Sequence, residues 1–125
     1  MLEHEMWMKK AVSDFLAAEK MVKDDDFTLD AAVFHAQQCA EKALKAYLAY
    51  REMPLQKTHS LLRLVDMCQA LDSTFLELID YLKVLNPYSI AFRYPGIQLD
   101  PDREEVLQAI EFAQKVLNYI SEKCK

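Results

Sequence analysis

The chain has 125 residues, of which 52% are hydrophobic and 28% are charged, and its formal net charge is −5. This length suits one domain with a substantial core, and the acidic balance argues against a general nucleic-acid-binding protein, because non-specific affinity comes from neutralising phosphates. One glycine and four prolines leave little turn material for a many-stranded sheet. We therefore expect residues 1–125 to form a single all-α domain, an antiparallel up-and-down bundle of about five helices.

Two long helices are expected in the first half of the chain. Apolar residues recur every three or four positions from His4 to Lys23, and the run of aspartates that follows ends this helix, because aspartate side chains compete for backbone hydrogen bonds. The second helix is expected from Leu29 to Arg51. It ends before Pro54, since the residue that precedes a proline is disfavoured in the helical conformation.

Two shorter helices are expected next, after a turn at residues 54–57. Thr58 is the predicted N-cap of the third helix. Thr74 and Glu77 match the capping-box pattern, in which cap and third-position side chains bond reciprocally with the backbone. This pattern predicts a fourth helix that runs to about Leu85.

The last forty residues predict a long connection and a closing helix. Residues 87–100 are expected to be extended and non-helical, and they are rich in aromatic side chains. Asp100 is the predicted cap of the fifth helix, because Pro101 then occupies the first helical position, where a missing N–H does no harm.

One face of the second helix is unusual for a scaffold helix. His35, Gln38, Lys42 and Lys45 lie three or four positions apart and share one stripe, with Glu41 at its edge. The opposite face carries mostly small side chains, namely Ala32, Ala36, Cys39, Ala40, Ala43 and Tyr47. We call His35, Gln38, Lys42 and Lys45 the polar stripe. It indicates a site for a polar, anionic partner, with ordinary solvated side chains as the alternative.

Positive charge is concentrated at the end of the polar stripe. Residues 42–63 contain five cations and one anion, a local balance of +4 on an acidic chain. Such a patch suits a discrete anionic ligand or an acidic partner. His59, near the start of the third helix, would either bind an anion with the help of the helix N-terminus or fix the loop structurally.

The cysteines and histidines predict neither a disulfide framework nor a metal site, and no cofactor is expected. The three cysteines lack a C-x-x-C pair, and the three histidines are scattered. Cys39 and Cys68 lie in apolar stretches and are expected to be buried thiols. Because the sequence has no apolar run near 18 residues and no signal-peptide pattern, we expect a cytoplasmic protein without a membrane span.

Several short motifs follow one another along nearly the whole chain. They are Trp7 within its amphipathic helix, His35-x-x-Gln38-x-x-Glu41-Lys42-x-x-Lys45, Lys57-Thr58-His59-x-Leu61, Arg93-Tyr94-Pro95 and the closing amphipathic helix. In this order and spacing the chain resembles the HEPN family (higher eukaryotes and prokaryotes nucleotide-binding domain). The resemblance implies a helical bundle that usually forms a homodimer, and it implies two functional settings.

In the first setting, a non-catalytic HEPN subunit works with a separate minimal nucleotidyltransferase protein, as in toxin–antitoxin pairs, and binds this partner, a nucleotide or RNA. We favour this setting. The ligand-binding residues would then be His35, Gln38, Lys42, Lys45, His59, Arg93 and Tyr94.

In the second setting, HEPN proteins are metal-independent ribonucleases, often toxins, that use an arginine followed after four to six residues by a histidine. Residues 98–100 occupy these positions after Arg93, and none of them is histidine. A ribonuclease would therefore need Arg93 with a non-standard base such as His59 or His35, so the sequence favours a chain without catalytic activity. A third hypothesis is a purely structural homodimer.

Overall fold

The computed structural model describes residues 1–24, 28–91 and 100–125, and the side chains of these residues except 90 and 91. These ranges contain helices and no strand, which confirms the predicted all-α bundle. The elements are α1 (Glu3–Asp24), α2 (Leu29–Tyr50), α3 (Leu61–Leu71), the 3-10 helix η2 (Ser73–Leu78), α4 (Ile79–Leu85), α5 (Tyr88–Ala91) and α6 (Arg103–Lys123). No helix in the described ranges is long and apolar enough to cross a membrane.

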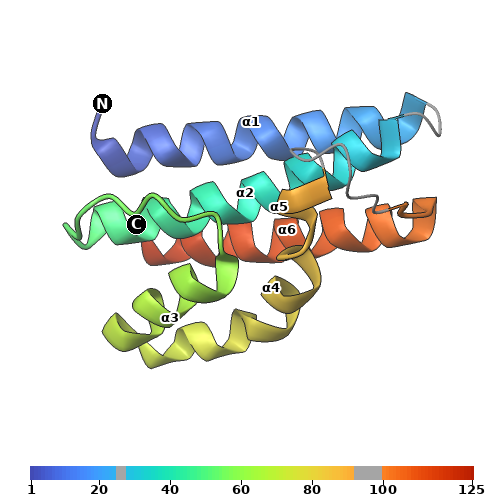
Figure 1. Cartoon of the computed structure of the whole chain (residues 1–125). Helices are drawn as coiled ribbons and strands as arrows, with labels where there is room; N and C mark the ends of the chain where they lie inside the picture. The colour runs from blue at the N-terminus through green and yellow to red at the C-terminus, as the bar shows by residue number, and fades with distance from the viewer. Residues whose placement is uncertain (25–27, 92–99) are drawn as a thin grey trace.

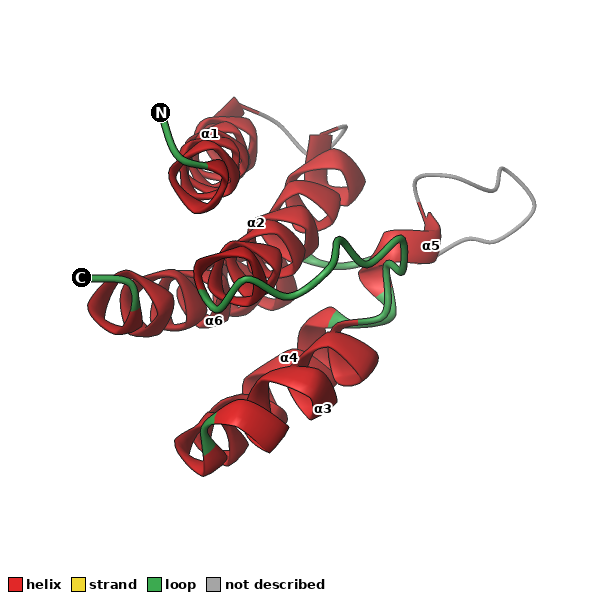
Figure 2. Ribbon diagram, turned by 90° about the vertical axis from the view of Figure 1, so that its left-hand side faces the viewer, coloured by secondary structure: helices red, strands yellow, loops and turns green. Residues whose placement is uncertain are grey.

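α2 is the central helix of the bundle. It contacts α1, α3, α4, α5 and α6, and α1 runs antiparallel to it while α6 runs in the same direction (Figure 1). α3 and α4 form a hairpin on the other side of α2 (Figure 2), and a hydrogen bond from the Leu61 N–H to Asn86 Oδ1 (2.8 Å) closes this hairpin. A central position requires a helix that is buried on most sides.

The small side chains of α2 make this central position possible. Fifteen of its 22 residues are buried, and the expected packing face is buried throughout, from Ala32 to Tyr47. Cys39 is part of that face, and Cys68 on α3 is buried as well, so both predictions of buried thiols are confirmed. Small residues let neighbouring helices approach closely, so the core around α2 is densely packed.

The path of the chain after α2 differs from the predicted turn at residues 54–57. The reversal occurs earlier, at Glu52, which has a left-handed φ of 59°, and Met53 donates its N–H to the Leu48 carbonyl at 2.9 Å. Residues 53–60 then run back along α2 without helical structure (Figure 1). This returning segment therefore brings His59 next to the middle of α2.

The limits of α1 and α2 are predicted to within one residue, but the N-caps predicted for the three later helices are wrong. Ser60 caps α3, because its Oγ accepts the Arg63 N–H at 3.2 Å, whereas Thr58 Oγ1 accepts the N–H of Ser60 itself. The correct cap lies two residues after the predicted one. Two hydroxyl residues stand near the helix start, and only the geometry of the returning segment decides between them.

The caps of the fourth and closing helices are also displaced by two residues. Asp72, not Thr74, is the cap, and it begins the 3-10 helix η2 rather than an α-helix; its Oδ1 accepts the Thr74 N–H at 3.0 Å. Asp102, not Asp100, caps α6, and its Oδ1 accepts the Glu105 N–H at 2.8 Å. In both places a second side chain with capping chemistry lies two positions away.

The predicted non-helical stretch 87–100 is wrong for its first part. Tyr88–Ala91 form one helical turn, α5, directly after Pro87. Proline is favoured at the start of a helix because its φ is already helical there. Residues 92–99 lie outside the described residues.

Candidate functional site

The surface of α2 that remains accessible is one narrow line. Between residues 31 and 49 every residue is buried except the half-buried Ala31, Phe34, His35, Lys42 and Ala49. Their spacing places them on one side of the helix. The predicted polar stripe lies on this line, but only His35 and Lys42 retain exposure, while Gln38 and Lys45 are buried. The stripe is thus mostly covered by its neighbours.

The first group of polar residues joins α2 to α1. Asp14 of α1 is buried, and its Oδ1 lies 2.8 Å from His35 Nδ1 while its Oδ2 accepts a hydrogen bond from Lys42 Nζ at 2.6 Å. We call Asp14, His35 and Lys42 the Asp14 cluster. Its lysine and histidine side chains are 24% and 26% exposed, so both reach the accessible line of α2.

The second group joins α2 to the returning segment. Lys45 Nζ donates to Glu41 Oε2 at 3.0 Å, and His59 Nδ1 lies 3.1 Å from Glu41 Oε1. Gln38 Nε2 donates to the same Oε1 at 3.2 Å, and Gln37 Nε2 donates to the His59 carbonyl at 3.2 Å. These five residues form the Glu41 cluster. Glu41 is only 3% exposed and Lys45 only 8%, so this ion pair is buried.

The positive charge predicted for this region is compensated within the protein. Asp14 and Glu41 offset the charges of Lys42 and Lys45, and both carboxylates lie outside the segment 42–63 whose balance is +4. Arg51 donates to the Tyr47 hydroxyl at 2.7 Å, whereas Lys57 and Arg63 are exposed. A balance counted along the sequence therefore overstates the local positive potential.

His59 is the member of these clusters with the best access to solvent. Its side chain is 49% exposed, although the buried Glu41 holds its Nδ1. A carboxylate that contacts one ring nitrogen fixes the orientation of the imidazole, as in many acid–base histidines. The site thus combines a fixed imidazole with a buried carboxylate, an arrangement compatible with acid–base chemistry.

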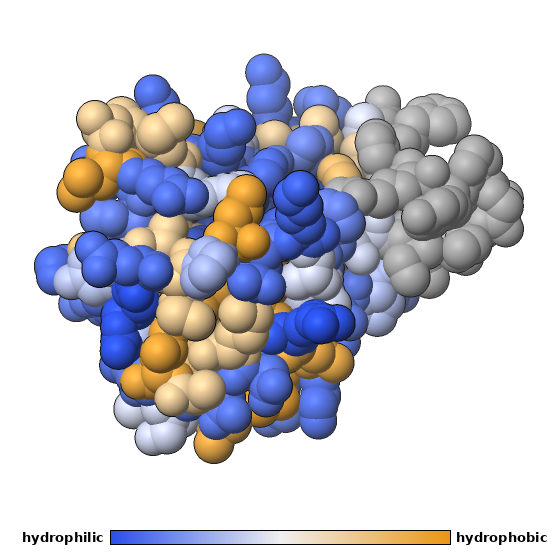
Figure 3. Space-filling model, turned by 60° about the vertical axis from the view of Figure 1, so that its left-hand side comes forward, coloured by the Kyte–Doolittle hydropathy of each residue, from blue (hydrophilic) through white to orange (hydrophobic). Residues whose placement is uncertain are grey.

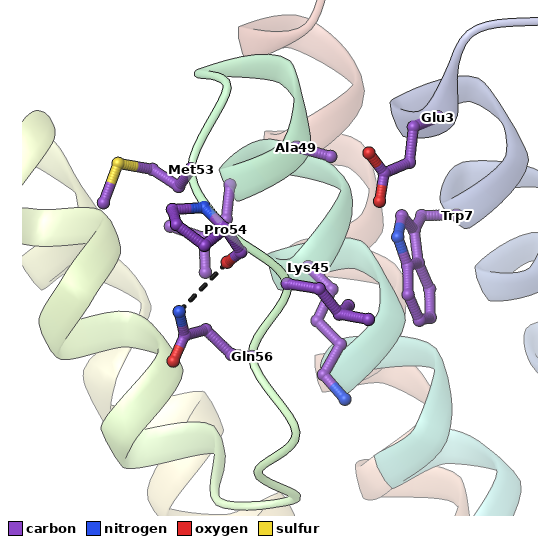
Figure 4. A pocket seen from close by; sticks show the side chains of 9 residues that line it. Glu3, Trp7, Lys45, Ala49, Met53, Pro54 and Gln56 are labelled. Carbon is purple, nitrogen blue, oxygen red and sulfur yellow. Dashed lines mark hydrogen bonds between the residues drawn. The ribbon is translucent and has the colours of Figure 1, made fainter.

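A narrow pocket lies at the end of α2, beside the Glu41 cluster. Glu3 and Trp7 of α1 face Lys45 across it, and residues 53–56 close its other side (Figure 4). Lys45 Nζ lies 5.6 Å from the centroid of the Trp7 ring, within the range of a cation–π interaction. The cavity volume of about 10 Å³ holds roughly one water molecule, so this pocket does not fit a nucleotide.

Asp14 is a cluster residue that the sequence interpretation missed. The signal was present, because Asp14 interrupts the apolar stripe formed by Ala11, Phe15 and Ala18 on the inner face of α1. An acidic residue on a buried face needs a partner. Its partners come from another helix, so the pairing requires the tertiary structure. Arg93 and Tyr94, the other predicted site residues, lie outside the described residues.

The cysteines contribute no nucleophile to this region. Burial raises the pKa of the Cys39 thiol to about 12, and the nearby Asp14 adds to the effect. Burial likewise raises the pKa of Cys68 to about 12. Both thiols are therefore protonated near neutral pH, and the thiolate is the form that reacts. Among the residues that the structure describes, no three His, Cys, Asp or Glu side chains are grouped to hold a metal ion.

The chain belongs to the HEPN family, since the model of the HEPN domain matches residues 4–124. Two crystal structures resemble it over nearly the full length of both chains. An archaeal HEPN homologue, ST0689, has a TM-score of 0.78 and 24% identity and covers 100% of each chain. The protein TT1696 from Thermus thermophilus has a TM-score of 0.79 and 29% identity, and the match covers 98% of this chain and 99% of the other. A comparison with curated proteins gave no match.

Proposed function

We propose that this chain is the non-catalytic binding subunit of a two-component system whose second protein is a minimal nucleotidyltransferase. The observation that carries the proposal is that carboxylates hold the polar stripe in place while its His35 and Lys42 remain accessible. Its lysines and His35, together with His59, contact carboxylates of the same chain, either Asp14 or Glu41. The family membership supplies the class of partner, because HEPN bundles of this kind occur with such enzymes.

The buried pair argues against a preformed phosphate site on the whole stripe. A phosphate at Lys45 would compete with Glu41, and removing one partner from a buried ion pair costs about 3–5 kcal/mol. Lys42 and His35 are partly exposed, so a ligand or partner reaches them more easily. In this proposal Gln38 and Lys45 support the surface from below, while His35, Lys42 and His59 form its accessible part.

The direct test is affinity isolation of the protein at its native level from its own cells, followed by mass spectrometry. The proposal expects a small nucleotidyltransferase to be recovered, and less of it with Lys42→Ala. Lys83→Ala, which changes an exposed lysine of α4, is the matched control and should leave recovery unchanged. Recovery of nothing except further copies of this chain would contradict the proposal and favour the structural homodimer.

A metal-independent ribonuclease is the second candidate, and the geometry of His59 favours it. Such an enzyme needs one group that takes the 2′-hydroxyl proton and another that stabilises the charged phosphorane. In this candidate His59, held by Glu41, is the base and Arg93 supplies the cation. RNA cleavage in the presence of a metal chelator that both Arg93→Ala and His59→Ala abolish would support this activity.

A further inference from the structure

The first two turns of α1 form an open depression next to the narrow pocket described above. Glu3, Met6, Trp7 and Lys10 line it, and their spacing of three, four and seven residues places them on one face of the helix. Met6 is 50% exposed, and Leu2, one turn before it, is exposed as well. Apolar and hydrophilic side chains lie side by side at this end of the bundle (Figure 3).

Trp7 lies between the depression and the narrow pocket and lines both. Lys45 packs against the indole ring, and the ion pair with the buried Glu41 fixes Lys45 in turn. The side chains of Trp7 and Glu3 project from α1 in the same direction (Figure 4). An aromatic side chain that is already ordered loses little entropy on binding, and such residues often anchor interfaces.

The two ends of the depression carry opposite charges. Neither the Glu3 carboxylate nor the Lys10 ammonium has a hydrogen-bond or ion-pair partner among the described side chains. Their separation of seven positions corresponds to about 10.5 Å along the helix axis, since each residue rises about 1.5 Å. The order along α1 is thus negative, apolar and positive.

We propose that this depression binds an amphipathic helix of a partner protein. The partner helix places an apolar side chain against Met6 and Trp7, a basic residue at Glu3 and an acidic residue at Lys10, the two charges being two turns apart. Charge complementarity selects this occupant, because a uniformly acidic or basic helix meets one like charge. The inference rests on the proposed binding role and adds to it a surface separate from the polar stripe.

The test uses two synthetic helical peptides and the fluorescence of Trp7, which is the single tryptophan of the chain. One peptide carries Arg and Glu seven positions apart with Leu between them, and the other carries Glu at both charged positions. We expect the mixed-charge peptide to bind the full-length protein about fivefold more tightly, the size of an exposed charge pair. Glu3→Lys should reverse this preference, whereas Glu5→Lys, on the opposite side of α1, should not change it.

The proposed docking surface would be wrong if the two peptides bound with equal affinity, if neither bound, or if Glu3→Lys left the preference unchanged. Its outcome is separate from that of the proposed function. Recovery of a nucleotidyltransferase without peptide binding would support the two-component role and contradict helix binding at the depression. Peptide binding without such an enzyme among the recovered proteins would support helix binding at the depression and contradict the enzyme as partner.

Discussion

The Asp14 cluster and the Glu41 cluster use the same three ionisable groups and differ in their surroundings. Each has one carboxylate in contact with one lysine and one histidine. In the Asp14 cluster the lysine is 24% exposed, and the cluster links two helices. In the Glu41 cluster the lysine is 8% exposed and two glutamine amides complete the network. Because the residue types are alike, we expect burial to determine how much each cluster contributes to stability.

The difference between the clusters concerns what each holds in place. α1 and α2 also pack through an apolar interface, so the Asp14 cluster adds to contacts that exist without it. The returning segment 53–60 has no regular structure, and the Glu41 cluster joins it to α2. Loss of the second cluster should therefore affect the fold more than loss of the first.

Replacement of Glu41 should have the largest effect. Glu41→Gln leaves the buried Lys45 ammonium without its counter-charge, and removing one partner of such a pair costs about 3–5 kcal/mol. Urea unfolding followed by circular dichroism measures this change. The double variant Glu41→Gln/Lys45→Met, which removes both charges, should recover part of the loss. A loss below about 1 kcal/mol for the single variant, the range of exposed pairs, would contradict the structural role of the Glu41 cluster.

Replacement of Asp14 should have a smaller effect. Asp14→Asn should lower the unfolding free energy by about 1–2 kcal/mol, because Lys42 and His35 can turn towards water when the carboxylate is gone. The same urea experiment compares the two variants directly. If Asp14→Asn proves as destabilising as Glu41→Gln, exposure does not account for the difference between the clusters.

A half-buried ion pair at the surface, Asp72 with Lys123, extends the comparison. Hydrogen bonds from Lys123 and Thr74 lower the pKa of Asp72 to about 2 from its ordinary value of 3.8. A lowered pKa stabilises the folded protein above the ordinary value, and this contribution is lost as the pH falls from about 4 to about 2. Asp72→Asn retains a capping side chain and removes the charge. We expect the unfolding free energy of wild type to exceed that of this variant by about 0.5–1 kcal/mol at neutral pH, as for ion pairs at the surface, and the difference to disappear near pH 2. A difference that stays constant across this range would contradict the expectation.

Replacement of Glu52, just before the returning segment, should have the smallest effect on stability. Glu52 has a left-handed φ of 59°, which costs a residue with a Cβ about 1 kcal/mol and costs glycine little. Glu52→Gly should therefore stabilise the protein by up to about 1 kcal/mol, whereas Glu52→Ala should not. Thermal unfolding of the two variants measures the difference. A lower melting temperature for the glycine variant than for the alanine variant would contradict the cost assigned to the left-handed conformation at Glu52.

The sequence predicts helices better than it predicts the environment of their polar residues. The limits of α1 and α2 follow from local periodicity, from the aspartate run and from Pro54. The caps were displaced because alternative capping residues lie two positions apart, and local spacing does not choose between them. The burial of Lys45 depends on where residues 53–60 pass, which no local pattern encodes.

The most direct test of the central claim, that these polar clusters bind and stabilise rather than catalyse, is an RNA cleavage assay with the purified protein and a metal chelator. Wild type and His59→Ala should give the same background. His4→Ala is the matched control, because His4 lies outside both clusters and packs against Tyr50. Cleavage that persists in His4→Ala and is lost in His59→Ala would contradict the account and identify a ribonuclease.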